Sequence, residues 1–241
     1  MPDTTTKRVS YFLVISIIGL FAAIIGFAKT FFVPVVAGTF SAPIGIHLHG
    51  ALAFAWVILF VLQASFIHFN RFNLHRTFGF IGIFIAIGVT VTMIPAGVFL
   101  VQKQLVQGKG DDGAYSGLIG VLTSGVFFLS LVLAGLANRD RPEFHKRYMM
   151  LATIVVLWPA WFRFRHYFPF VPRPDIWFAL VLADSLIVVS WIWEKIKFGK
   201  VHPVIAYVGL LIIFEQSLEV FAYNNPIWQA LSKWIFNFIT A

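Results

Sequence analysis

The stretch Tyr11–Val35 reads YFLVISIIGLFAAIIGFAKTFFVPV, and its predominantly apolar character decides the fold class of this chain. A helix needs about 20 apolar residues to cross the hydrocarbon core of a bilayer, so this stretch is long enough to span it. Its apolar run also exceeds the roughly 7–15 residues of a secretory signal, and no small-residue cleavage site stands out. We therefore predict that it remains in the membrane as an uncleaved anchor.

Six further apolar stretches follow, separated by turn residues and charged residues. The seven predicted spans cover residues 11–35, 43–67, 77–101, 116–136, 148–168, 175–193 and 203–223. The segment 226–240 is too short to span, and its Gln229, Lys233 and Asn237 share one helical face, which is typical of an amphipathic interfacial helix. A helix packed on the exterior of the bundle is the alternative. The sequence thus predicts an all-α membrane protein with one helical domain over residues 1–241.

The composition argues against the soluble classes of protein. Of the 241 residues, 59% are hydrophobic and 12% are charged, and the mean hydropathy is +0.86. A soluble domain has about 25% charged residues, so this chain has too few polar side chains for a water-exposed surface. A soluble enzyme, a disordered chain and a nucleic-acid-binding domain are therefore excluded. Because the chain has no cysteine, disulfides, iron–sulfur clusters and thiolate zinc sites are also excluded.

The distribution of Lys and Arg predicts the orientation in the membrane. If the N-terminus is cytoplasmic, the inner segments hold 11 of the 18 basic residues, in agreement with the positive-inside rule. Seven spans then place the C-terminus outside. We interpret the net charge of +8 as a sign of membrane orientation and not of a nucleic-acid partner. The expected partner is the lipid bilayer. A homo-oligomer and a larger membrane complex are both compatible with the sequence. The inner basic residues are Lys7, Arg8, Arg71, Arg76, Arg139, Arg141, Lys146, Arg147, Lys195, Lys197 and Lys200.

Ionisable residues inside predicted spans are costly and therefore suggest a functional site. The helical rise per residue places Asp184 and Glu215 near the midplane of the bilayer, and His49, Arg163 and Glu219 in an outer layer. Glu215 and Glu219 are four residues apart, so their carboxylates leave the same helix face. These five residues form the predicted ligand or proton site. The alternatives are a structural Arg163–Glu219 ion pair, a metal or haem site, and a proton or substrate pathway.

Histidines form a second pattern, with His47 and His49 near the outer surface and His75 and His145 near the inner one. Neutral imidazole ligates haem b or a transition metal, which makes these four residues candidate ligands. His47 and His49 are two residues apart and diverge on a helix, so we expect only His49 to face inward. His49 and His68 lie about 30 Å apart along their helix, at its ends rather than in an apolar slot. Headgroup contacts or helix caps are therefore the alternative.

Four short sequence elements, each built around one or two histidines, lie between about residues 45 and 205. They are His47-Leu48-His49 with Trp56 and Gln63, His75-Arg76 with Gly79, His145-Lys146-Arg147 with Met149, and Gly199 with His202-Pro203. In these elements the chain resembles a group of bacterial multi-pass membrane proteins that has no assigned activity. The resemblance implies a location in the bacterial inner membrane and supplies no catalytic residues. A looser similarity to cytochrome b-type bundles depends only on the histidines at helix ends.

Three functional hypotheses follow from these residues. The first is a binding protein or accessory redox protein whose buried histidine and carboxylate side chains hold a metal or haem, or handle protons. The second is a small transporter in which Asp184, Glu215 and Glu219 carry protons or bind a cation. The third is a structural subunit of a larger membrane complex. The sequence does not decide whether any reaction is catalysed.

Overall fold

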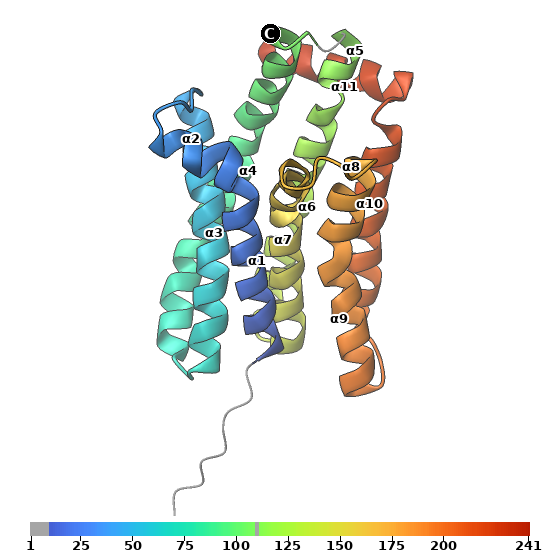
Figure 1. Cartoon of the computed structure of the whole chain (residues 1–241). Coiled ribbons are helices and arrows are strands. Elements are labelled where there is room, and N and C mark those ends of the chain that lie inside the picture. The colour runs from blue at the N-terminus through green and yellow to red at the C-terminus, as the bar shows by residue number, and fades with distance from the viewer. Residues whose placement is uncertain (1–9, 109–110) are drawn as a thin grey trace, which may run out of the picture.

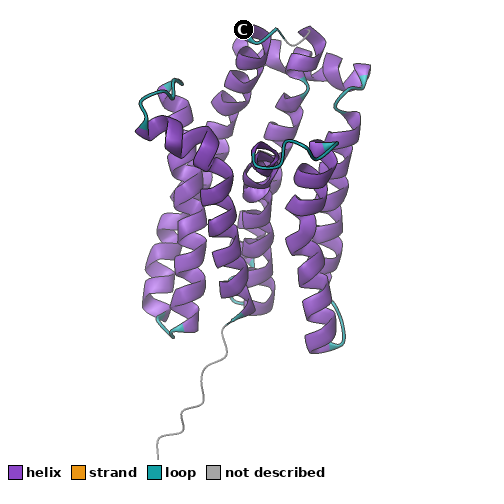
Figure 2. Cartoon of the chain, in the orientation of Figure 1, coloured by secondary structure: helices purple, strands orange, loops and turns teal. Residues whose placement is uncertain are grey.

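The computed structural model describes residues 10–108 and 111–241, and every regular element in that part of the chain is helical (Figure 2). Six helical stretches are long and apolar enough to cross a membrane, so the chain has the architecture of a multi-pass membrane protein. These stretches are Tyr11–Val36, Ile44–His68, Phe72–Val106, Gly113–Ala137, Pro174–Phe198 and Val204–Ala222.

Several of these stretches combine an α-helix with a tighter or wider helical turn, which we label η. The N-terminal half contains α1 (Tyr11–Phe27), η1 (Ala28–Phe32), α2 (Val33–Val36), α3 (Ile44–His68), α4 (Phe72–Val106), α5 (Asp111–Tyr115) and α6 (Gly117–Ala137). The C-terminal half contains α7 (Pro142–Phe162), η2 (Arg163–His166), α8 (Pro174–Ile176), η3 (Trp177–Leu182), α9 (Ala183–Phe198), η4 (Val204–Val208), α10 (Gly209–Ala222) and α11 (Pro226–Thr240). The turns η1, η3 and η4 are π-helical, and η2 is a 3-10 turn.

The helix α7 differs most from its predicted position, because it begins at Pro142 instead of residue 148 and ends at Phe162 instead of residue 168. Proline is well suited to the first helical position, where a missing N–H costs nothing. The charged residues of the first two turns are neutralised by pairing among Glu143, Lys146 and Arg147, so the helix extends into a polar segment. This polar start is also why hydropathy places α7 outside the six apolar stretches.

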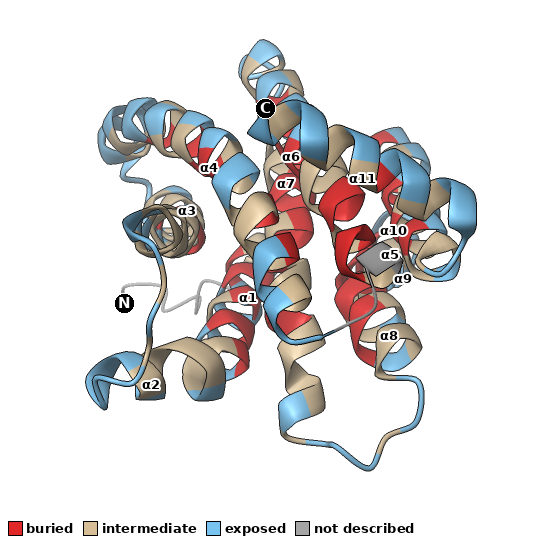
Figure 3. Cartoon of the chain, turned by 90° about the horizontal axis from the view of Figure 1, so that it is seen from above, coloured by how far each residue is buried: buried red, intermediate tan, exposed pale blue. Residues whose placement is uncertain are grey.

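The hydrophobic core is centred on α7, which packs against α1, α3, α6 and α9. Leu151 and Ile154 of α7 are almost completely buried, together with Phe128 of α6. Figure 3 shows the buried residues on the facing sides of α1, α6 and α7, with exposed residues on the outer faces of the bundle. Large apolar side chains such as Phe80 and Phe84 of α4 are exposed there, as expected for a surface in contact with lipid.

The bundle has two ends, between which the long helices run (Figure 1). We call one the basic end: it holds the start of α1 and the connections α3–α4, α6–α7 and α9–η4, with Arg71, Arg139 and Lys195 among its residues. The opposite end holds α2, α5, η2, α8 and α11. Successive long helices therefore alternate in direction.

The C-terminal helix α11 lies across the opposite end, over α5 and α6 (Figure 1). The Asn225 side chain caps its N-terminus by accepting from the Ile227 N–H at 2.9 Å. The Trp228 indole donates to the Ser116 carbonyl at 2.9 Å, and Ser232 is completely buried. Trp234 and Phe238 remain exposed, so α11 packs on the bundle and presents aromatic side chains outward.

Candidate functional site

Three carboxyl side chains come together between α6, α9 and α10. Asp184 lies at the start of α9, directly after the π-helical turn η3, while Glu215 and Glu219 lie one turn apart on α10. Glu215 is close enough to both Asp184 and Glu219 for their charges to interact. We call Asp184, Glu215 and Glu219 the carboxyl cluster.

The helix α6 supplies the wall of the carboxyl cluster. The Thr123 hydroxyl donates to Glu215 Oε1 at 2.5 Å. The Glu219 carboxyl group lies directly against Gly120, where a Cβ atom would overlap its oxygens. A glycine at this position therefore makes the space that the Glu219 carboxyl occupies.

The carboxyl cluster contains unsatisfied polar atoms. Asp184 is 4% exposed, and both of its carboxyl oxygens are buried without a hydrogen-bond partner. The side-chain oxygen of Gln216, on the same helix as Glu215, is also buried without a partner. None of the ion pairs in the described part of the chain includes any of the three carboxyl groups. Since an unpaired buried carboxylate is very costly, such a group becomes neutral by taking up a proton or by binding a cation.

The structure separates Arg163 from the carboxyl cluster, so the expected Arg163–Glu219 pair is not found among the ion pairs of the described residues. The Arg163 guanidinium instead donates to Thr30 Oγ1 at 3.1 Å and to the Pro159 carbonyl at 2.7 Å, and it lies over the Phe27 ring. Depth along the helix axis was estimated from residue spacing, but depth does not determine which neighbouring helix a side chain meets. The turn η2 directs Arg163 toward α1 and η1.

His49 also lies apart from the carboxyl cluster, between α3 and α4. Its Nδ1 is 3.0 Å from Thr92 Oγ1, and the Thr92 hydroxyl donates to the Gly88 carbonyl at 2.6 Å. Since the hydroxyl has a single proton, His49 Nδ1 is the donor to Thr92. His47 packs against Phe31 and Phe40 instead.

Of the four candidate haem or metal ligands, the structure brings together only His75 and His145, at the basic end. Their ring centroids are 6.2 Å apart. His145 Nδ1 lies 2.8 Å from the Gly135 carbonyl and is therefore a protonated nitrogen that donates to it. His75 Nδ1 and both amide atoms of Gln63 are buried without a partner. Among the residues that the structure describes, no group of three or more His, Cys, Asp or Glu side chains is placed to hold a metal.

The sequence did not predict the buried ion pair between α7 and α9. Arg147 and Glu194 are 3% and 2% exposed, and Arg147 Nη2 lies 2.6 Å from Glu194 Oε1. Arg147 Nη1 also pairs with Glu143 Oε2 at 2.6 Å, and the His202 N–H donates to Glu194 Oε2 at 2.6 Å. The one signal in the sequence was a single acidic residue, Glu194, among the cations of an otherwise basic connection.

The Arg147–Glu194 pair ties three elements together at the basic end: α7, α9 and the connection before η4. Burial, and then the charge of Arg147, lower the pKa of His202. Its Nδ1 accepts the Val204 N–H at 3.2 Å, which requires that nitrogen to be unprotonated. This arrangement holds α9 and the connection before η4 against α7 at the basic end.

The comparisons with known proteins assign neither a family nor a function. No protein family, no characterised protein and no solved structure is significantly similar to this chain.

Proposed function

We propose that the protein crosses the bacterial inner membrane seven times, with its N-terminus in the cytoplasm and its C-terminus outside. In this proposal α7, the fifth long helix along the chain, spans the membrane in addition to the six apolar stretches. Its 21 residues give a length of about 30 Å, which is enough to cross the bilayer. Its charged first turns are paired, and its sides are covered by other helices. The Lys and Arg residues of the basic end support its cytoplasmic location. The resemblance described above supports the inner membrane.

A topology reporter tests this orientation. Alkaline phosphatase fused after Ala241 is expected to be active, since that enzyme folds only outside the cytoplasm, and the same reporter inserted at Arg139 is expected to be inactive. A reporter that requires the cytoplasm should give the opposite pattern. A fusion after Ala241 that reads as cytoplasmic would contradict the proposal of seven spans with the N-terminus in the cytoplasm.

We propose that the carboxyl cluster moves protons or a small cation across the membrane, which makes the protein a small proton- or cation-coupled transporter. The observation that carries this proposal is Asp184, whose two carboxyl oxygens are buried without a partner beside Glu215 and Glu219. Ionisable groups at this depth mark proton relays and ion pathways in membrane proteins.

The backbone around the carboxyl cluster supports the same proposal. The π-helical turn η3 ends at Leu182, two residues before Asp184, and η4 directly precedes α10. Single π-helical turns are frequent at functional sites. In transporters, interrupted helices supply the backbone groups that bind the transported ion.

The test of this proposal is ion flux. Wild-type protein in liposomes is expected to dissipate an imposed proton or cation gradient, and Asp184→Asn is expected to abolish that flux. Absence of flux in wild-type liposomes for both protons and monovalent cations would contradict the proposal.

A second candidate function is favoured by the pair His75 and His145. Two neighbouring imidazoles from α4 and α7, arranged edge to face, supply ring nitrogens of the kind that hold haem iron or a metal ion between helices. Gln63 offers a third polar group there. In this role the protein is an accessory redox component.

An absorption spectrum distinguishes this second function. If it is correct, protein from haem-replete cells has a Soret band, with α and β bands after reduction, and His145→Ala removes them. His68→Ala is the matched control, because His68 lies at the same end of the bundle and its ring contacts Phe69. A colourless protein without a bound transition metal would rule out the redox function and leave the transport proposal unaffected.

A further inference from the structure

A cluster of basic side chains occupies the opposite end of the bundle, where the positive-inside rule predicts few cations. Lys29 Nζ of η1 donates to the His166 carbonyl at 3.1 Å and lies over the Tyr167 ring. Arg163 bonds to Thr30 of η1, and Arg165 donates to the Phe162 carbonyl at 2.8 Å. We call Lys29, Arg163, Arg165 and His166 the outer basic cluster.

The packing of α1 against α7 assembles this cluster. Gly26 of α1 lies so close to Ala160 that a Cβ atom on the glycine would overlap the Ala160 carbonyl. The two backbones therefore touch at the point where α1 changes to the π-helical turn η1. The Tyr167 hydroxyl donates to the Ile25 carbonyl at 2.7 Å and holds the end of η2 against α1.

The outer basic cluster has no acidic partner in the described part of the chain. The ion pairs of the described residues involve Lys146, Arg147 and Arg173, none of which belongs to the outer basic cluster. Asp175, an acidic residue at the same end, is paired with Arg173 at 2.8 Å. Burial, and then the charges of Arg165, Arg163 and Lys29, lower the pKa of His166, so these three cations lie within electrostatic reach of the His166 ring. Helix carbonyls accept from these cations but use few of their N–H groups. A guanidinium has five N–H donors, and the carbonyl and hydroxyl contacts occupy the Nε and Nη1 groups of Arg163 and only Nη1 of Arg165.

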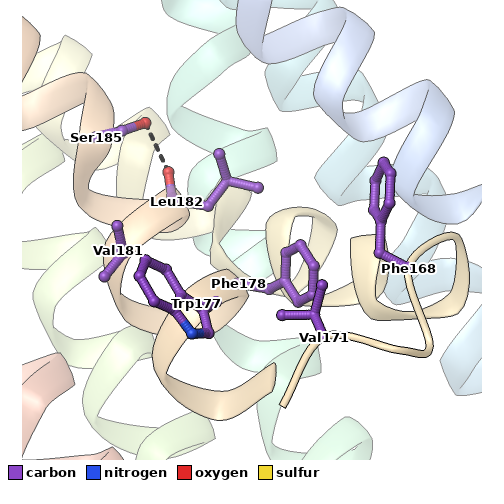
Figure 4. A pocket seen from close by; sticks show the side chains of 7 residues that line it. All are labelled: Phe168, Val171, Trp177, Phe178, Val181, Leu182 and Ser185. Carbon is purple, nitrogen blue, oxygen red and sulfur yellow. Dashed lines mark hydrogen bonds between the residues drawn. The ribbon is translucent and has the colours of Figure 1, made fainter. Parts of the chain in front are cut away.

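An apolar cleft of about 490 Å³ begins two residues after this cluster, at Phe168. Figure 4 shows Trp177, Phe178 and Val181 projecting from η3 beside Phe168 and Val171. The Ser185 hydroxyl at its edge donates to the Leu182 carbonyl at 2.7 Å, and the other polar side-chain group in the lining is the Trp177 indole N–H. Trp177 and Val181 are about half exposed, so the cleft opens on the outside of the bundle.

A cationic cluster without acidic partners, followed two residues later in the chain by the first residue of an open apolar cleft, matches a molecule with an anionic head and a hydrocarbon tail. We propose that this end of the protein binds an anionic phospholipid, with the phosphate on the outer basic cluster and one acyl chain in the cleft. Guanidinium groups bind phosphate through paired hydrogen bonds, and cations near a membrane surface attract anionic headgroups. This site is separate from the carboxyl cluster and goes beyond the transport proposal.

The experiment measures lipid binding to the full-length protein in detergent by native mass spectrometry. Phosphatidylglycerol is titrated against phosphatidylcholine with the same acyl chains and against inorganic phosphate. We expect phosphatidylglycerol to bind at least tenfold more tightly than phosphatidylcholine. Each removed cation should weaken binding about fivefold, so Lys29→Gln with Arg165→Gln should weaken it about 25-fold. Arg173→Gln is the matched control, because that cation lies at the same end but is paired with Asp175.

A second variant separates lipid from free anion. Val181→Asn places a polar group in the cleft and should weaken phosphatidylglycerol binding without changing the thermal unfolding temperature, since Val181 is 49% exposed. Equal binding of phosphatidylcholine, or equal loss in Arg173→Gln, would show that the cluster does not select an anionic headgroup and overturn the proposal. Inorganic phosphate that binds as tightly as the lipid, with Val181→Asn neutral, would show a free-anion site and overturn it as well.

Discussion

Replacing Arg147 with methionine is expected to lower the free energy of unfolding by about 3–5 kcal/mol, because it leaves the carboxylate of Glu194 buried without its partner. Both side chains are at most 3% exposed, and their closest atoms are 2.6 Å apart. The loss should appear as a large decrease of the thermal unfolding temperature in detergent. It should also destabilise the contact of α9 and η4 with α7, which positions the carboxyl cluster.

The other partner of Arg147 provides the control. Glu143 is 60% exposed, so Glu143→Gln should cost less than about 1 kcal/mol. The double variant Arg147→Met with Glu194→Leu removes both buried charges and should recover much of the stability. Recovery should be incomplete, because the His202 N–H loses its acceptor, Glu194 Oε2, at a cost of about 1–3 kcal/mol. If Arg147→Met costs no more than Glu143→Gln, the buried pair does not hold the two helices together.

The variant Asp184→Asn is expected to reduce proton or cation flux in liposomes by about a hundredfold or more, the range found when a positioned proton-transfer group is removed. Asparagine has nearly the same shape as aspartate, so packing is preserved while the ionisable group is lost. Glu219→Gln should have a similar effect because Glu219 belongs to the same cluster. The measurement is the decay of an imposed gradient with a fluorescent indicator inside the liposomes.

Two matched controls make this test specific. Asp175→Asn removes a carboxyl group that is exposed and paired with Arg173, and its flux should equal that of the wild type. Gly120→Ala introduces a Cβ where the Glu219 carboxyl lies and should reduce flux with all three carboxyl groups retained, whereas Gly113→Ala meets open space and should be neutral. Wild-type flux in Asp184→Asn and Glu219→Gln would show that the carboxyl cluster is not the ion pathway.

The sequence was most informative about the carboxyl cluster. Spacing along the chain placed Asp184 and Glu215 at one depth and put Glu219 on the same face as Glu215, and the structure has these three residues in one group. The sequence was least informative about Arg163. Glu219 was considered as the partner of Arg163 only because the two residues have similar depths and opposite charges. In the structure the partners of Arg163 are Thr30 and Pro159, and the sequence contains no signal for that contact.

By itself, the sequence determined an all-helical chain with long apolar helices, because the length and apolar content of a helix are local properties. It predicted seven spans, and the structure has six helical stretches that are long and apolar enough to cross a membrane. It also determined which residues lie near either end of the bundle, since helical rise is constant. Only the tertiary structure decided which helices are neighbours. That choice depends on how helix surfaces fit, as where Gly26 admits the Ala160 backbone and Gly120 admits the Glu219 carboxyl. The contacts of Arg147 with Glu194 and of His75 with His145 have the same cause, as does the contact of Arg163 with Thr30 in place of Glu219. Lateral contacts follow from the shapes of the helix surfaces, and hydropathy and periodicity carry no information about those shapes.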